Sequence, residues 1–222
     1  MAWPGNWVGC NAAGIVGFNL AQGSNIGVAF EGFNAISLGP VAPTASQGKG
    51  LTVQGQYLLY SGGLIDQELD VTLGIMQDWF TKLTIVGTTD SRYWIGVSDA
   101  TSSTAATIMN SDTPSANVVA FRFATDADTT IKAVCQTGSS SQTVVDTGVA
   151  PSTSTPQLFE IVPTSGGASV TFYIDGTLVA TITSNVPANT VPMNSIMCVD
   201  AYNNGSSNYQ FNFYYFYMLL AS

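Results

Sequence analysis

Val170–Thr183 reads VTFYIDGTLVATIT, two runs of alternating apolar residues joined by Asp175-Gly176. Asp-Gly is one of the dipeptides that best tolerate the left-handed dihedrals of a two-residue hairpin turn. Successive side chains of a strand point to opposite faces, so each run presents one apolar face. The residues expected on that face are Val170, Phe172, Ile174, Leu178, Ala180 and Ile182. The stretch predicts a β-hairpin with one buried side.

Similar runs recur along the chain, with turn residues between them and no convincing amphipathic helix. We expect alternating strands at Asp66–Met76, Val118–Phe123 and Thr130–Thr137. About twelve to fourteen short strands with turn signals between them are typical of a sandwich or jelly roll. The predicted fold is therefore all-β, an antiparallel two-sheet jelly-roll sandwich at residues 51–222, preceded by an N-terminal arm and first strands at residues 1–50.

The composition limits the possible partners and reactions. The 222 residues are 45% hydrophobic and 9% charged, against about 25% charged in a typical soluble domain. The net charge of −9 argues against nucleic acid and against an anionic membrane surface. The sequence has no histidine, which excludes Ser-His-Asp and Cys-His nucleophiles and His-based zinc sites. Few charges favour packing into an assembly.

Three cysteines, Cys10, Cys135 and Cys198, are too few for a disulfide framework. Buried free thiols are the simpler interpretation, and one bridge with a leftover thiol is the alternative. The first residues lack the basic and apolar regions of a signal peptide, so we expect synthesis in a cytoplasm.

Aromatic residues near both ends suggest self-assembly. Trp3 and Trp7 lie in the N-terminal arm, which either folds onto its own domain or anchors to a neighbouring subunit. Near the C-terminus, FNFYYFYMLLA (211–221) is apolar on both faces of a strand, with Tyr214 and Phe216 opposite the other rings. A strand that is apolar on both faces is buried on both, in a core or a subunit interface. We expect these four residues to make assembly contacts.

Several motifs recur in an order that resembles a known group. They are Arg92–Val97 (RYWIGV), Ala120–Arg122, Val145–Gly148, Leu158–Val162, the Val170–Thr183 hairpin and Asn185–Asn189. This succession resembles the concanavalin A-like (laminin G/glucanase-type) sandwich modules of tailed-phage virion proteins, in tails, fibres and head decorations. The resemblance covers about residues 50–220 and leaves the first fifty unexplained. It implies a structural part of a virion, made in the host cytoplasm, with other virion proteins as partners.

Three groups of residues are candidates for chemistry or binding. Asp66, Glu68 and Asp70 lie on one strand face and resemble the Glu-x-Asp-x-Glu motif of glucanases, although Asp replaces Glu at both ends. Asp126 and Asp128 could bind Ca²⁺ through oxygen ligands, or could simply form a turn. Sugar-stacking rings are expected at Trp94, Tyr202 and Tyr209.

From the sequence we expect a non-enzymatic virion component that forms a homo-oligomer and presents a host- or glycan-facing surface. We expect the protein to use no cofactor, with bound Ca²⁺ as the alternative. A carbohydrate-binding module is the alternative, and a glycan hydrolase that uses Asp66, Glu68 and Asp70 is the third possibility.

Overall fold

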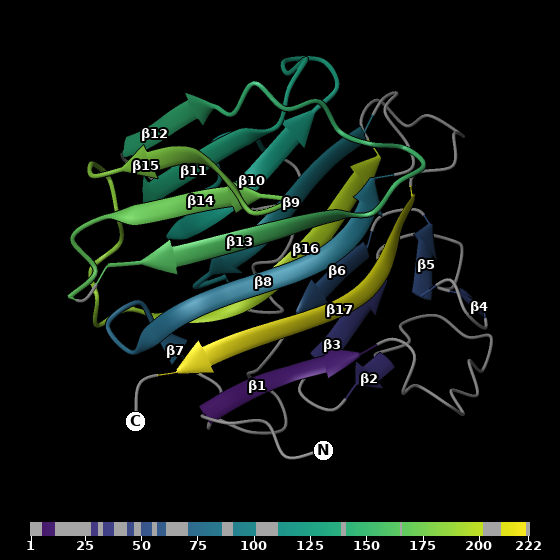
Figure 1. Ribbon diagram of the computed structural model, residues 1–222, viewed down its shortest axis with the longest axis horizontal. Coiled ribbons are helices and arrows are strands. Elements are labelled where there is room, and N and C mark those ends of the chain that lie inside the picture. Colours follow the sequence, from purple (N-terminus) through teal and green to yellow (C-terminus); the bar gives the residue numbers. More distant parts are fainter. Residues whose placement is uncertain are drawn as a thin grey trace.

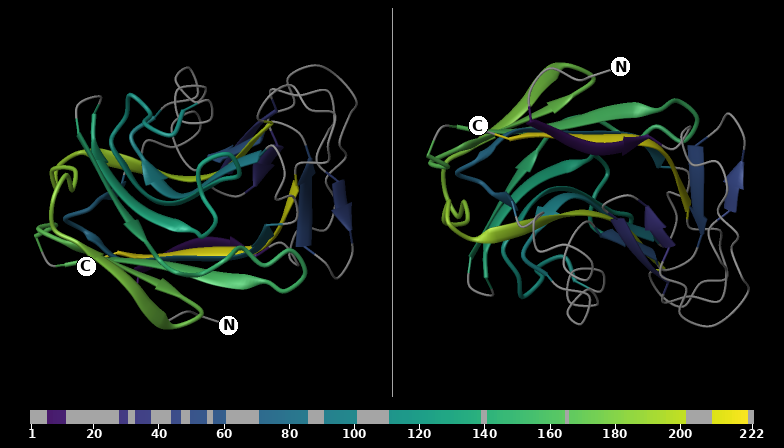
Figure 2. Two further views of the ribbon diagram at one scale, coloured as in Figure 1. Left: turned by 90° about the horizontal axis from the view of Figure 1, so that it is seen from above. Right: turned by 90° about the horizontal axis from the view of Figure 1, so that it is seen from below.

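The computed structural model is a sandwich of two antiparallel β-sheets, seen face-on in Figure 1 and as two stacked layers in Figure 2. The structure describes residues 72–85, 91–100, 111–138, 141–164 and 166–193 with their side chains. It also describes the backbone of strands at residues 6–11, 28–30, 33–37, 44–46, 50–54, 57–60, 71, 194–201 and 210–220. Every regular element among these residues is a strand, so the predicted all-β two-sheet sandwich is confirmed. No helix long and apolar enough to cross a membrane occurs among them.

Sheet A faces the viewer in Figure 1 and has the strand order β15-β14-β13-β8-β17-β5-β4, with β1 also paired to β17. Its strands are β1 (Asn6–Asn11), β4 (Thr44–Ser46), β5 (Gly50–Gln54), β8 (Met76–Ile85), β13 (Gln157–Pro163), β14 (Val170–Ile174), β15 (Thr177–Ile182) and β17 (Gln210–Leu220). All of its pairings are antiparallel.

Sheet B lies behind sheet A in the order β12-β11-β10-β9-β16-β6-β3-β2, with β7 also paired to β16. Its strands are β2 (Val28–Phe30), β3 (Phe33–Ser37), β6 (Tyr57–Tyr60), β7 (Val71–Thr72), β9 (Ser91–Ser98), β10 (Val118–Ala124), β11 (Lys132–Thr137), β12 (Ser141–Asp146) and β16 (Pro192–Ala201). Strands from the first fifty residues thus pair within both sheets, so their described part folds onto its own domain.

The hydrophobic core fills the space between the sheets, because alternate residues of each strand point inward. Phe121 of β10 lies at its centre and packs edge-on against Phe159 of β13 and Phe172 of β14, with ring centroids 5.1 and 5.2 Å apart. Such ring pairs stabilise a fold by about 0.5–1.5 kcal/mol beyond the burial of their area. Phe121 therefore joins the two sheets directly.

The predicted hairpin is present, with an irregularity that the sequence pattern did not predict. Asp175 and Gly176 form the two-residue turn with φ of 51° and 75°. Phe172 is opposite Ala180 but Tyr173 is opposite Leu178, so Val179 is an extra residue in β15. Val179 packs against the core and Leu178 is 54% exposed. The expectation that Leu178 is buried is therefore wrong, because the bulge reverses the faces at this end of the strand.

The strand predicted at Asp66–Met76 is not continuous. Among its described residues, β7 ends at Thr72 and a turn occupies residues 73–75. The N–H of Gly74 donates to the carbonyl of Asn189 at 3.1 Å, which fixes this turn against a distant loop. Leu73 is buried in the core while Ile75 is 43% exposed, so these two residues do not share a face.

The C-terminal strand β17 also has an irregular register. Phe213 is opposite Leu83, whereas Tyr215 is opposite Lys82, so the ladder with β8 shifts at Tyr214. Tyr214 is therefore the inserted residue of a bulge, and the simple two-face alternation predicted for this strand is interrupted. On its other edge, β17 pairs with β1, where Leu219 is opposite Trp7.

Candidate functional site

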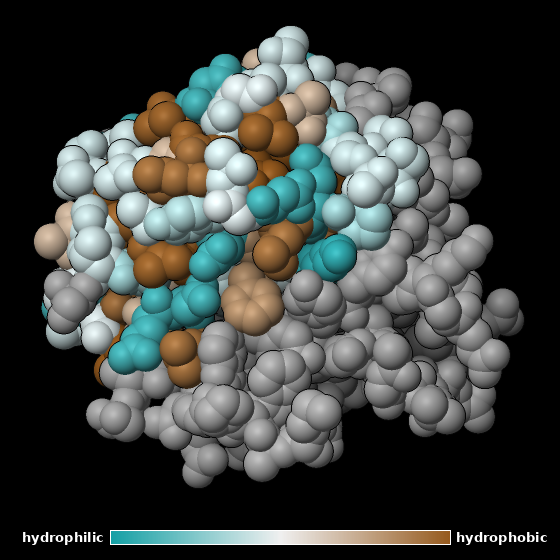
Figure 3. All heavy atoms as spheres, viewed as in Figure 1, coloured by the Kyte–Doolittle hydropathy of each residue, from teal (hydrophilic) through white to brown (hydrophobic). Residues whose placement is uncertain are grey.

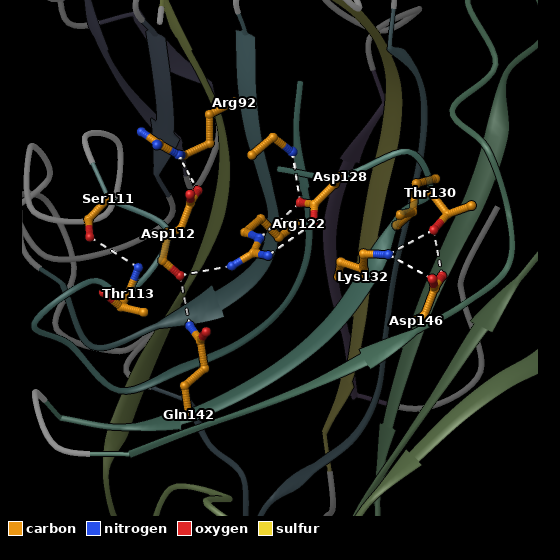
Figure 4. Close-up of polar contacts among 12 residues, drawn as sticks. Arg92, Ser111, Asp112, Thr113, Arg122, Asp128, Thr130, Lys132, Gln142 and Asp146 are labelled. Atoms are coloured by element: carbon orange, nitrogen blue, oxygen red, sulfur yellow. Dashed lines mark hydrogen bonds and ion pairs between the residues drawn. The ribbon is translucent and has the colours of Figure 1, made fainter. Parts of the chain in front are cut away.

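The outer face of sheet B carries a network of ion pairs, one buried (Arg122–Asp128) and one partly buried (Arg92–Asp112), drawn in Figure 4. Arg122 of β10 holds Asp128 with two parallel bonds, from Nε to Oδ2 and from Nη2 to Oδ1, each 3.1 Å long. The N–H of Ala124 donates to Oδ2 of Asp128 at 3.0 Å. This fork geometry is the strongest way in which an arginine can satisfy a carboxylate.

The same network attaches the segment 111–117 to sheet B. The carboxylate of Asp112 accepts a bond from Nε of Arg92 at 2.7 Å. Its carbonyl accepts bonds from Arg122 at 3.0 Å and from Gln142 of β12 at 2.9 Å. The carbonyl of Pro114 accepts a bond from Gln136 of β11. These side chains therefore hold a loop in place, and their bonding capacity is used within the protein.

Trp94 lies in the middle of this outer face and is 0% exposed. The guanidinium carbon of Arg122 lies 5.9 Å from the centroid of its ring. Its Nε1 is buried without a hydrogen-bond partner. The expectation that Trp94 presents its ring to a sugar is therefore not met, because nothing of the ring is accessible.

The two aspartates expected to bind Ca²⁺ have different environments. Asp126 is exposed in the turn after β10, whereas Asp128 is buried and uses both carboxylate oxygens on Arg122. Arg122 thus takes the place of a cation at Asp128. Among the residues that the structure describes, no group of three or more Asp, Glu, Cys or His side chains could hold a metal ion.

The outer face of sheet A contains a different group of polar residues. Tyr173 of β14 is directly opposite Glu160 of β13, which is directly opposite Phe80 of β8. Residues opposite each other on antiparallel strands lie on the same face of the sheet, about 4.5–5.5 Å apart. Asp78 lies two residues before Phe80 and hence on this face too, diagonal to Glu160 at about 7–8 Å. We call Asp78, Phe80, Glu160 and Tyr173 the carboxylate face.

All four residues of the carboxylate face are half-buried and open to solvent on one side. Figure 3 views sheet A from this side and shows hydrophilic residues in a band across it, with hydrophobic residues beside them. Lys82 of β8, opposite Leu158, is also half-buried on this face. Acidic, aromatic and basic side chains are thus available together on an accessible surface.

The two carboxyl groups are electrostatically unusual. Burial, and to a smaller extent the charge of Glu160, raise the pKa of Asp78 from 3.8 to about 7, against the opposing effect of a backbone hydrogen bond at Trp79. Burial also raises the pKa of Glu160. Oδ1 of Asp78 is buried without a hydrogen-bond partner. Near neutral pH, Asp78 therefore exchanges a proton beside a second carboxyl group, which is a common feature of functional sites.

The remaining candidate residues from the sequence fall largely outside the described residues. Trp3, Asp66, Glu68, Asp70, Tyr202 and Tyr209 lie there, and Trp7, Tyr214 and Phe216 are described only as backbone of β1 and β17. None of the described strands carries two acidic residues, so an acid motif at spacing two does not occur on any of them. The sequence analysis missed Asp78 and Glu160. The available signal was a single acid inside an apolar run, MQDWF and LFEIV, in a chain with few charges.

Comparison with known proteins identifies the fold but not a family. No family model matches the chain, and no curated protein matches it by sequence. Solved structures do match. The β-glucanase of Bacillus licheniformis is 12% identical with a TM-score of 0.56, and the match covers 98% of this chain and 99% of the glucanase. The Crh5 transglycosylase is 12% identical with a TM-score of 0.63, covering 97% of this chain and 85% of that chain.

A third match is the carbohydrate recognition domain of Emp47p, 9% identical with a TM-score of 0.57, covering 86% of this chain and 90% of that domain. The chain thus has the concanavalin A-like jelly-roll fold of glucanases and lectin domains, as the resemblance implied. The matched proteins bind or cleave glycans, and none of these three is a phage protein.

The expectation that the protein is not an enzyme requires correction. It followed from the missing histidine and the imperfect Asp-x-Glu-x-Asp motif. However, the structures that share the fold include a glucanase and a transglycosylase, so this fold supports glycan-cleaving activity. Glycosidase chemistry uses two carboxyl groups and needs no histidine.

Proposed function

We propose that the protein binds carbohydrate on the carboxylate face. The observation that carries this proposal is the row Tyr173–Glu160–Phe80 with Asp78 diagonal to it on the same open face of sheet A. Binding sites for small polar ligands combine aromatic surface with a few placed polar groups. Here the two rings flank a carboxyl group and could cover the apolar faces of sugar rings.

The protonation of Asp78 supports the same proposal. Its pKa of about 7 means that near neutral pH the carboxyl group can donate as well as accept a hydrogen bond. Sugar hydroxyl groups both donate and accept hydrogen bonds, like those of Ser and Thr. They therefore suit a carboxyl group that is protonated part of the time. The fold, which glycan-binding proteins share, supports the same ligand class.

A glycan array followed by calorimetry on the positive sugars tests this proposal. The variants Phe80→Ala and Tyr173→Ala should each weaken binding about tenfold or more, because each loses a stacking surface worth at least about 1.4 kcal/mol. Asp126→Asn, an exposed acid in a turn of sheet B, is the control and should bind normally. Binding that survives both ring variants, or no binding to any glycan, would refute the assignment.

A second candidate function is cleavage of the glycosidic bond, which the pKa of Asp78 near 7 favours. In glycosidases one protonated carboxyl group gives its proton to the leaving oxygen while the second, ionised group acts as nucleophile or activates water. Asp78 would be the acid and Glu160 the ionised partner. Asp78→Asn and Glu160→Gln should each abolish the release of reducing ends without abolishing binding, and the wild-type rate should fall as the pH rises above about 7.

From the motif resemblance, we also propose that the protein is part of a phage virion and contacts other virion proteins. The support is the low fraction of charged residues, 9%, which lowers the cost of burying subunit contacts. Antibodies against the protein should then label intact particles of the phage that encodes it. Labelling of infected-cell lysate but not of purified particles would contradict this location.

A further inference from the structure

The strand β12 ends sheet B and leaves one edge open. It pairs with β11 through six consecutive residues, from Lys132 opposite Asp146 to Thr137 opposite Ser141. No described strand is paired with its other edge, and none of the described backbone hydrogen bonds joins that edge to another segment. β15 of sheet A and the two residues Ser184 and Asn185 contact β12 through side chains and packing, which leaves the backbone edge unpaired. An open edge presents a row of backbone donors and acceptors that another strand can pair with.

The end strands β15 of sheet A and β12 of sheet B differ in how well they are protected against pairing with another strand. Natural proteins guard open edges with bulges, prolines or lysines. At the corresponding end of sheet A, β15 contains the bulge at Val179. In contrast, β12 has the sequence SQTVVD, with no proline or lysine, and its register with β11 has no irregularity. Thus β15 is built to resist pairing and β12 is not.

β12 is also held in position and is electrically neutral. Its Thr143 side chain accepts a bond from Asn185 at 2.9 Å and lies 3.0 Å from the hydroxyl of Ser184. Its only charged residue, Asp146, pairs with Lys132 at 2.8 Å between Oδ2 and Nζ. In a chain of net charge −9, a neutral edge is where a second copy can approach with least repulsion.

Val144 adds an apolar contact to this edge, because 41% of its surface is exposed. We propose that β12 pairs antiparallel with β12 of a second copy, so that sheet B continues across a two-fold axis. Antiparallel pairing of identical strands places the Asp146 end of one copy beside the Ser141 end of the other, which keeps the two aspartates apart. The contact is on the opposite sheet from the carboxylate face and does not depend on glycan binding.

Light scattering on the full chain, over a wide range of concentration, tests the proposal. We expect the wild type to reach twice the chain mass. Val144→Lys places two like charges near the axis and should raise the dissociation constant by about tenfold or more. Leu178→Lys is the matched control on the bulged edge, where Leu178 is 54% exposed, and should dimerise as the wild type does.

Hydrogen exchange on the wild type provides a second measurement that needs no variant. The amides of β12 should exchange more slowly at high protein concentration, and those of β15 should not change. A wild type that is monomeric at every concentration overturns the proposal. So does a Val144→Lys dimer of unchanged affinity, or dimerisation without slower exchange in β12. If Val144→Lys does not fold, the exchange result decides.

Discussion

Gly96 of β9 lies directly opposite Ala120 of β10, and a Cβ added to Gly96 would be only 2.5 Å from the Cα of Ala120. Real Cβ atoms essentially never come within 3.0 Å of another heavy atom. On its other side Gly96 is opposite Ile196 of β16, so it lies in the interior of sheet B. The two nearest atoms, the carbonyl oxygen of Val119 and the Cα of Ala120, belong to backbone, which cannot move aside as a flexible side chain can.

Gly96→Ala should therefore destabilise the fold. We expect the free energy of unfolding to fall by about 1–3 kcal/mol, the usual cost of overpacking, measured by urea denaturation. Gly138→Asn is the control, because Gly138 has φ of 53° and a Cβ added to it would meet no atom within 4 Å. Asn tolerates that left-handed conformation, so its stability should hardly change. Equal stability of the Gly96 variant and the wild type would show that β9 and β10 can separate.

Removing only one partner of the Arg122–Asp128 ion pair should destabilise the fold more than removing both charges together. The side chain of Asp128 is 3% exposed, so Arg122→Met leaves an uncompensated buried carboxylate. We expect the free energy of unfolding to fall by about 3–5 kcal/mol. The double variant Arg122→Met/Asp128→Asn should recover part of that loss, because the remaining amide carries no charge.

A matched comparison separates this buried pair from an exposed one. Lys132–Asp146 has a similar bond length, 2.8 Å, but the Asp146 side chain is 59% exposed. Lys132→Met should therefore cost much less than Arg122→Met, since water screens the remaining charge. A similar fall in the free energy of unfolding for the two variants would contradict the conclusion that Arg122 compensates a buried charge at Asp128.

The hairpin shows how far local sequence patterns determine this fold. Asp175-Gly176 specified the turn, because few dipeptides adopt two consecutive positive φ values. The side-chain periodicity then predicted Ala180 and Ile182 as buried, correctly, and Leu178, wrongly. A bulge adds a residue without any change in hydrophobic pattern, so the face of Leu178 could not be read from alternation.

The candidate site was harder to predict than the fold. Asp78 and Glu160 are 82 positions apart in sequence, and only the β8–β13 register brings them onto one face. The sequence analysis instead favoured acids at spacing two, because that spacing is visible without knowing which strands are neighbours. The expected exposure of Trp94 was wrong for a related reason. The local sequence RYWIGV does not show that the distant loop 111–117 is hydrogen-bonded to Arg92 and Arg122 on the same face of sheet B as Trp94.

Cys135 should be unreactive in the folded protein. The thiol is buried and free, and burial raises its pKa, so almost no thiolate exists at neutral pH. The thiolate is the nucleophile in alkylation. Iodoacetamide followed by peptide mapping should leave Cys135 unmodified in buffer and modify it fully in urea. Rapid labelling in buffer would indicate that β11 opens.

Asp78 should make the folded protein less stable as the pH rises. Its carboxyl group keeps a proton up to about pH 7 when folded but releases it near 3.8 in the unfolded chain. Between these values the folded state binds more protons than the unfolded state, so the free energy of unfolding decreases with increasing pH. Asp78→Asn has no proton to release and should remove this decrease.

The melting temperature of Asp78→Asn should match that of the wild type near pH 4 and exceed it near pH 8, by about 2–4 °C for each kcal/mol recovered. Asp126→Asn, in an exposed turn, should follow the wild-type curve. Parallel curves for the wild type and Asp78→Asn would mean that Asp78 ionises normally, and the acid role proposed for it in glycan cleavage would then fail.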